Sequence, residues 1–236
     1  MRQIIYVKYN RTRSEKFQLK TAIVRENGAL SVEKTALTEA GAGHMGSFWE
    51  KYQMIREQNP RIRFLEPEFK DGGKTVCFRY LEGETLADAL ADRIHMGQIP
   101  YEELERVMAL VFPEDFSVDS GHFSIKEQTG GPFAPSQGFT EVFGPVPEGL
   151  EELGRLTAAP NVDGLFENLM ISDGHVYGID YEWVFDMEIP ARFLHYRNLL
   201  YFYRRCEASV SSAQEELFAH FGIGEEEQRL FASMEE

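Results

Sequence analysis

The chain of 236 residues is 43% hydrophobic and 27% charged, the balance of a folded globular protein that is large enough for a hydrophobic core. Acidic residues outnumber basic ones by 39 to 24, which gives a formal net charge of −15. Because that charge repels polyanions, it argues against duplex nucleic acid and anionic membranes as partners. One basic cluster near the N-terminus is interpreted as a solvated hairpin; it comprises Lys8, Arg11, Arg13, Lys16 and Lys20.

Three features bear on where the protein works. No apolar run approaches the ~18 residues that a membrane-spanning helix needs. The N-terminal segment is too short and too polar for a signal peptide. Cys77 and Cys206 lie in apolar stretches and do not have the spacing of metal ligands. We therefore expect two buried thiols, no membrane span and a cytoplasmic location.

The N-terminal third of the chain is predicted to be rich in strands. Alternation and turn residues indicate strands at 4–9, 17–25, 30–37, 63–69 and 75–80, with a helix at 44–58 after the third. In the third strand Lys34 shares a face with three apolar neighbours, because side chains alternate along a strand. Lys34 is therefore expected to point the same way as the apolar side of this strand.

The remainder is predicted to be mainly helical. Helices are expected at 87–94 and 101–111, and a helical pattern runs from Pro190 to the end. The stretch 113–147 is rich in turn residues and is expected to be a long irregular insert. Two short strands, 169–171 and 175–179, are expected to form a hairpin around a Ser-Asp-Gly turn.

The strongest chemical signal is a set of three polar residues around this hairpin. Asp163 precedes Asn168 by five residues, and Asp180 follows Asn168 by twelve. Because a hairpin brings its two ends together, Asn168 and Asp180 are expected to meet at one metal ion, and their oxygens suit Mg²⁺. Asp163, in the loop just ahead, is then placed to face a substrate hydroxyl. Taken singly, each residue also has a structural interpretation, as a turn residue, a loop-bonding amide or a paired acid.

This segment resembles the catalytic loop and metal-binding segment of the protein-kinase-like superfamily. The Ile-Asp-x-Glu sequence at 179–182 is similar to that of the aminoglycoside phosphotransferase, choline kinase and lipopolysaccharide kinase branch, where it replaces the Asp-Phe-Gly of protein kinases. The Val-Glu-Lys sequence ending at Lys34 looks like the strand that carries the ATP lysine. Glu50 looks like the helix glutamate that holds this lysine, with Glu57 as an alternative.

The resemblance implies an α+β, bilobal fold. A strand-rich small lobe, an antiparallel sheet plus one helix, would span residues 1–78. A hinge would follow at 79–86, and a mainly helical large lobe with the catalytic loop would span 87–236.

The same resemblance implies a role for each matching residue. Lys34, held by Glu50, would grip the α- and β-phosphates of ATP. The backbone of the hinge residues Arg79, Tyr80 and Leu81 would meet adenine. Asn168 and Asp180 would bind Mg²⁺, and Asp163 would orient the acceptor and take its proton.

Three departures from the family pattern are visible. Asn161 stands where the family often has histidine, and Leu165 stands where many protein kinases have a catalytic lysine, which argues against a protein kinase. No glycine-rich loop joins the first two strands, since the sequence from Asn10 to Glu15 occupies that place.

The expected function is transfer of a phosphoryl group from ATP to a hydroxyl of a small molecule. The resemblance suggests a sugar or a surface-polysaccharide component as the acceptor. The alternative is a nucleotide-binding pseudokinase or scaffold domain, which the missing histidine and glycine-rich loop would permit.

Overall fold

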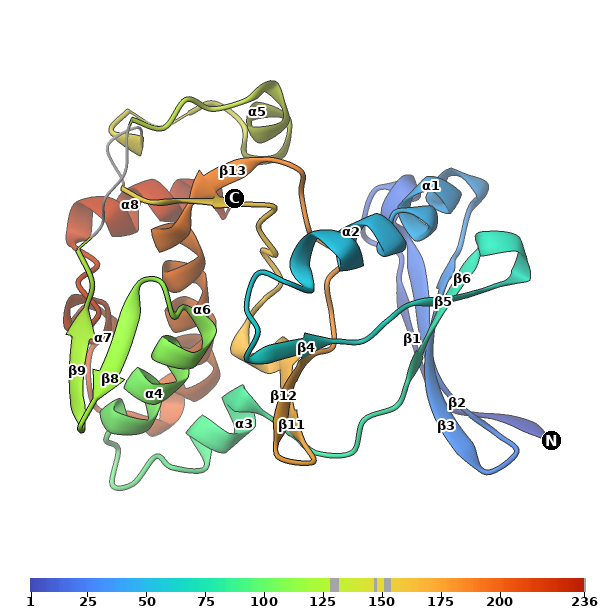
Figure 1. Cartoon of the computed structure of the whole chain (residues 1–236), viewed down its shortest axis with the longest axis horizontal. Helices are drawn as coiled ribbons and strands as arrows, with labels where there is room; N and C mark the ends of the chain where they lie inside the picture. Colours follow the sequence, from blue (N-terminus) through green and yellow to red (C-terminus); the bar gives the residue numbers. More distant parts are fainter. Residues whose placement is uncertain (128–131, 147, 151–153, 236) are drawn as a thin grey trace.

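A five-stranded antiparallel sheet forms one end of the molecule (Figure 1). The structure is a computed structural model that describes residues 1–127, 132–146, 148–150 and 154–235. The strand order is β1-β2-β3-β6-β5, with bounds Arg2–Asn10 (β1), Leu19–Glu26 (β2), Ala29–Ala36 (β3), Thr75–Arg79 (β6) and Glu68–Lys70 (β5). Asn27 and Gly28 join β2 to β3 with φ of 51° and 88°, the backbone of a tight hairpin turn. The strands expected at 4–9, 17–25, 30–37 and 75–80 are thus present.

The expected helix at 44–58 is divided. It forms α1 (Ala42–Gly46) and α2 (Phe48–Ile55), with Ser47 between them. The Ser47 hydroxyl donates to the His44 carbonyl at 2.8 Å, a local bond that competes with regular helix geometry. Phe48 and Ile55 are buried, so α2 packs its apolar side inward.

The prediction of a single strand at 63–69 is wrong. Residues Ile62–Phe64 form β4, which leaves the five-stranded sheet and pairs in parallel with β12 (His175–Gly178). Pro67 separates β4 from β5, because proline has no N–H to donate to a sheet. A second sheet results, of order β4-β12-β11-β7, which includes β11 (Leu169–Ser172) and β7 (Glu84–Thr85).

Glycine lets this second sheet assemble. A Cβ on Gly178 would lie 2.3 Å from the Phe64 ring, so the ring occupies the space of a missing side chain. Gly83, with φ of 155°, comes so close to the Ile171 carbonyl that a Cβ would lie 1.9 Å from its oxygen. The sheet therefore requires these two glycines at close backbone contacts.

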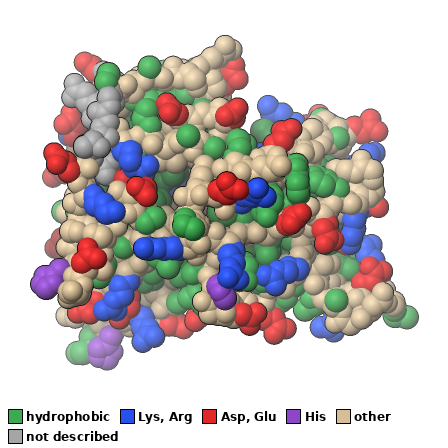
Figure 2. Space-filling model, in the orientation of Figure 1, with side chains coloured by type: hydrophobic (Ala, Val, Ile, Leu, Met, Phe, Trp, Pro, Cys, Tyr) green, Lys and Arg blue, Asp and Glu red, His purple; other side chains and the backbone are tan. Residues whose placement is uncertain are grey.

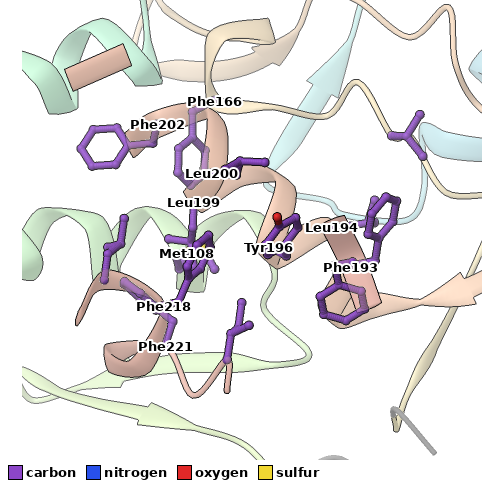
Figure 3. Packing of buried hydrophobic residues seen from close by; sticks show 14 of the residues in the cluster. Met108, Phe166, Phe193, Leu194, Tyr196, Leu199, Leu200, Phe202, Phe218 and Phe221 are labelled. Carbon is purple, nitrogen blue, oxygen red and sulfur yellow. The ribbon is translucent and has the colours of Figure 1, made fainter. Parts of the chain in front are cut away.

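Helices make up most of the other end of the molecule. They are α3 (Leu86–Ala91), α4 (Tyr101–Val111), α6 (Ala191–Cys206), α7 (Gln214–His220) and α8 (Glu225–Met234). The helix α6 runs through their core, and Figure 3 shows its apolar side chains packed among those of α4 and α7. The helical pattern expected from Pro190 onward is present, with short connections between the helices. Among the described residues, no helix is both long and apolar enough to cross a bilayer.

The stretch 113–147 is more ordered than expected. It contains the hairpin of β8 (Phe116–Asp119) and β9 (His122–Ile125), and the helix α5 (Gln137–Phe143). Residues 128–131 and 147 lie outside the described part. A further strand pair, β10 (Leu156–Ala158) with β13 (Glu188–Pro190), lies beside α6. Single 3₁₀ turns complete the fold at Glu15–Phe17, Glu39–Gly41, Asp71–Gly73, Phe166–Asn168 and Glu207–Ser209.

The molecule has two hydrophobic cores, one toward each end. The larger one joins the helices, and the smaller one lies between α2 and the five-stranded sheet. Tyr177, Tyr181 and Val184, which come late in the chain, belong to the smaller core. The rings of Phe48 and Phe78 pack against Tyr181, with centroids 5.6 and 5.8 Å away. The exact lobe limits of 1–78, 79–86 and 87–236 remain a prediction.

Candidate active site

The β11–β12 hairpin brings the predicted metal ligands together. Asn168 ends a 3₁₀ turn directly before β11, and Asp180 follows β12 by two residues. The Ile179 amide donates to the Asn168 carbonyl at 3.0 Å, so the two ends of the hairpin are bonded to each other. The backbones at the two ends of the hairpin are therefore adjacent, and the binding of one metal ion by Asn168 and Asp180 stays a prediction.

The loop that carries Asp163 is tied to the same hairpin. The Asn168 side-chain amide donates one of its two N–H groups to the Asp163 carbonyl at 2.9 Å, which orients this amide. The Asp163 amide donates to Asn161 Oδ1 at 3.3 Å, and Asn161 Nδ2 lies 3.5 Å from the Asp180 carbonyl. Asn161 thus links the loop to the segment that carries Asp180, a role that the sequence did not indicate.

Lys34, in β3 of the five-stranded sheet, contacts the segment that contains Asp180 and Glu182. Its Nζ lies 2.9 Å from Asp180 Oδ2, and it also pairs with the Glu182 carboxylate. Lys34 is only 5% exposed. Burial alone would lower the pKa of Lys34, but the carboxylates of Asp180 and Glu182 outweigh it, so this pKa is raised.

The structure corrects the expected partner of Lys34. Glu50 lies on the exposed side of α2, and no contact between it and Lys34 is found in the described part of the chain. Phe48, Lys51 and Ile55 form the buried side of α2, and Glu50 falls outside that side. Glu182, the last residue of the Ile-Asp-x-Glu sequence, takes the position expected for a glutamate that holds Lys34.

A second buried lysine was missed. Lys51 Nζ donates to the Glu182 carbonyl at 2.5 Å and lies 3.5 Å from His44 Nδ1. Burial lowers the pKa of Lys51 to about 8, and burial together with Lys51 lowers the pKa of His44 to about 4. The three-residue spacing from Phe48 was the available signal, because it places Lys51 on the inner side of α2.

The loop between β1 and β2 packs against Glu182 and Trp183. Arg13 Nη1 lies 2.6 Å from Glu182 Oε2, and the guanidinium carbon of Arg13 lies over the Trp183 ring, 5.1 Å from its centroid. Phe17 packs edge-on against Trp183 with centroids 4.7 Å apart. Lys34 and Arg13 together hold the pKa of Glu182 below its usual range, although burial opposes them. At least one member of the basic cluster is therefore part of the site rather than fully solvated.

The hinge residues occupy different environments. The Arg79 side chain stacks over Tyr177, at 5.0 Å from the ring centroid. The Tyr80 amide already donates to the Leu30 carbonyl at 3.3 Å, and Leu81 is buried in the smaller core. Contact of this stretch with adenine remains a prediction, and the Tyr80 amide would have to exchange its partner to take part.

Asp163 is partly buried close to other acids. Burial, reinforced by the charge of Asp180, raises the pKa of Asp163 to about 7. A carboxylate whose pKa lies near neutrality is suited to accept a proton, since driving force and protonation state are then balanced.

The donor set fits a magnesium ion that is also held by phosphate and water. Asp180, whose side chain is 30% exposed, would contribute a carboxylate, and Asn168 would contribute its amide oxygen. Magnesium in proteins commonly has one or two such ligands plus substrate phosphates. Within the described residues, no cluster of three or more His, Cys, Asp and Glu is arranged to hold a metal without such help.

Solved structures with a similar fold exist for small-molecule kinases. A choline kinase from Streptococcus pneumoniae superposes with a TM-score of 0.52 and 12% identity, over 99% of this chain and 82% of that chain. A macrolide 2'-phosphotransferase from Brachybacterium faecium (TM-score 0.44, 11% identity, 97% and 82% covered) and an aminoglycoside phosphotransferase (0.46, 14%, 98% and 83%) are also similar. Comparison with protein-family models and with curated protein sequences found no match.

The match to the choline kinase spans nearly the whole chain and shows the fold. The chain shares the bilobal, α+β fold of this choline kinase. The resemblance inferred from the motifs is thereby confirmed at the level of fold.

Proposed function

We propose that the protein is an ATP-dependent phosphotransferase that acts on a hydroxyl of a small molecule. The observation that carries this proposal is the contact of Lys34 with Asp180, which are 146 residues apart, beside the bonded pair of Asn168 and Asp163. A cation, two oxygen ligands and a carboxylate of raised pKa are the groups that phosphoryl transfer needs.

Each residue then has one task. Lys34 would bind the phosphates of ATP, and Asn168 and Asp180 would hold Mg²⁺, which neutralises phosphate charge when bound. Asp163 would orient the acceptor hydroxyl and accept its proton. In the described state Lys34 and Asp180 neutralise each other, so phosphate and metal would each replace one partner of this ion pair.

The acceptor is proposed to be a small molecule with a free hydroxyl, and a sugar is the first candidate. The choline kinase and the antibiotic phosphotransferases named above support a small acceptor, since such kinases share the fold. A soluble, cytoplasmic location is proposed with it.

A binding module without catalysis is the second candidate. The specific observation in its favour is that Arg13 and Lys34 both pair with the Glu182 carboxylate. A scaffold domain would keep this arrangement and would bind nucleotide without transferring phosphate.

Thermal unfolding with ATP, with and without Mg²⁺, tests nucleotide binding. We expect MgATP to raise the free energy of unfolding by about 2.7 kcal/mol at about 100 times its Kd, because it binds only the folded state. EDTA should cancel most of the gain, and the variant Asp180→Asn should lack it. No shift at millimolar MgATP would contradict both candidates.

Transfer of labelled phosphate, or slow hydrolysis of ATP, separates the two candidates. We expect Asp163→Asn to abolish turnover and to leave the MgATP-dependent stabilisation nearly unchanged, because the amide is isosteric but accepts no proton. Equal hydrolysis by wild type and Asp163→Asn would refute the role of Asp163. Wild-type protein that binds MgATP yet phosphorylates nothing in a panel of sugars and amino alcohols would favour the binding module.

A further inference from the structure

A hollow of about 690 Å³ lies on the face of the molecule formed by α2, β4 and β12. Its charged lining consists of Arg56, Arg63 and Arg79 with Glu57 and Glu66. Figure 2 shows basic side chains gathered over β4 and β12 on this face. The cluster stands out because the protein as a whole carries a net charge of −15.

Two of the three arginines have no acidic partner among the residues that the structure describes. Arg56 pairs with Glu57 at 3.0 Å, which leaves Glu66 as the other acid of the lining. Arg63 and Arg79 form no ion pair with any carboxylate in the described part of the chain, although both are exposed on an acidic protein. Their charges are therefore available to an external anion.

Tyr177 holds these two arginines close together. Arg63 Nη1 lies 3.5 Å from the Tyr177 hydroxyl, and the Arg79 guanidinium stacks over the same ring at 5.0 Å. Hydrogen bonding with Arg63 and Arg79 lowers the pKa of Tyr177, which reports a positive potential at its hydroxyl. A stacked guanidinium has lost much of its rotational freedom before a ligand arrives, so less entropy is lost on binding.

The two arginines come from different sheets. Arg63 lies in β4 of the sheet β4-β12-β11-β7, whereas Arg79 ends β6 of the five-stranded sheet and begins the predicted hinge. The register places Arg79 opposite Ser31 and Val76 opposite Lys34, so Arg79 and Lys34 lie on opposite faces of their sheet. The Arg79 side chain therefore lies on the other face of the sheet from Lys34, although the Arg79 backbone belongs to the predicted hinge.

We propose that Arg63 and Arg79, with the Tyr177 hydroxyl, form a binding site for a small phosphate-bearing anion. The bound anion would contact both sheets, next to the predicted hinge. Arginine binds phosphate oxygens through paired N–H groups, and the tyrosine hydroxyl supplies a further donor. Glu66 at the rim disfavours long polyanions, so a single phosphate group is the expected recognition element.

Calorimetric titration of the full chain with inorganic phosphate, at ionic strength kept constant with sodium chloride, tests this site. We expect saturable binding that Arg63→Gln and Arg79→Gln each weaken about tenfold, since each removes a charge-assisted contact. The double variant should bind phosphate more weakly than either single one, because each arginine supplies a contact of its own to the same anion. Circular dichroism should be unchanged in all three, since both side chains are exposed.

Two controls locate the bound phosphate. Arg25→Gln removes an exposed arginine of β2 outside the hollow and should leave the affinity unchanged. Lys34→Ala removes the cation of the candidate active site and should also leave it unchanged, whatever becomes of MgATP binding. Equal losses in Arg25→Gln, loss only in Lys34→Ala, no saturable binding at all, or tighter binding of polyglutamate than of phosphate would each overturn the proposal.

Discussion

Lys34, Asp180 and Glu182 form a chain of opposite charges in which each side chain depends on its neighbours. Lys34 and Glu182 are almost fully buried, at 5% and 4% exposure. Buried charges are costly unless they are paired, so loss of one partner leaves the other destabilised. This dependence identifies Glu182, rather than Glu50, as the acid that the folded state needs.

Substitutions of Glu182 and Glu50 should therefore differ in their effect on stability. We expect Glu182→Gln to lower the free energy of unfolding by about 2–4 kcal/mol, because Lys34 keeps only Asp180 and Arg13 loses its carboxylate. The matched variant Glu50→Gln should stay within about 0.5 kcal/mol of wild type, as exposed substitutions usually do. Urea unfolding measures both, and a larger loss in Glu50→Gln would contradict the assignment.

Lys51 provides a test by pH. Its folded pKa of about 8 lies below the unfolded value of 10.5, so the unfolded chain binds more protons between these limits and stability rises with pH across that range. The neutral variant Lys51→Met lacks this slope. Between pH 8 and pH 10.5 we expect the free energy of unfolding of wild type to rise by roughly 1–3 kcal/mol relative to that of Lys51→Met.

The measurement for Lys51 is urea unfolding of both proteins at several pH values without metal. Lys74→Met, which replaces a lysine that is exposed in the folded protein, serves as the control for removal of a lysine charge. A constant difference between Lys51→Met and wild type over the range would show that Lys51 titrates normally in the folded protein.

At the scale of elements, β4 depends on one glycine. We expect Gly178→Ala to destabilise the protein by about 1–3 kcal/mol, because the new methyl group would overlap the Phe64 ring on the neighbouring strand. Gly43→Ala is a suitable control, since its Cβ would meet nothing within 4 Å inside α1 and alanine favours helix. Thermal unfolding compares them, and a neutral Gly178→Ala would mean that Phe64 moves aside without cost.

At the scale of the whole molecule, the smaller core is completed by residues distant in sequence. The Tyr181 hydroxyl donates to the Leu65 carbonyl at 2.7 Å, and the Tyr181 ring contacts the rings of α2 and β6. A chain limited to residues 1–78 would lack this tyrosine together with Tyr177 and Val184.

We therefore expect the fragment 1–78 not to fold alone. A domain of this size has little core to lose, so the missing aromatic rings should leave it without a cooperative transition. Circular dichroism during urea titration is the measurement, with the full chain as the control. A sharp transition in the fragment would show that the five-stranded sheet is stable without the late segment.

Local patterns in the sequence were sufficient for most strands, the main helices and the hairpin that carries Asn168 and Asp180. These features depend on alternation, helical spacing and turn residues within a few positions of one another. The bilobal fold was predicted from the order of short motifs around Asp163, Lys34 and the Ile-Asp-x-Glu sequence, and the superposition on a choline kinase confirmed this fold.

The partners of those residues were decided only by tertiary structure. Glu182 replaced Glu50 beside Lys34 because α2 turns Lys51 and not Glu50 toward the interior, a matter of helix rotation that motif spacing does not specify. The strand expected at 63–69 was divided because β4 gains a parallel partner more than a hundred residues later, opposite Gly178. Pairings of this kind depend on packing between distant segments, and a single strand or helix carries no record of which distant segment it will meet.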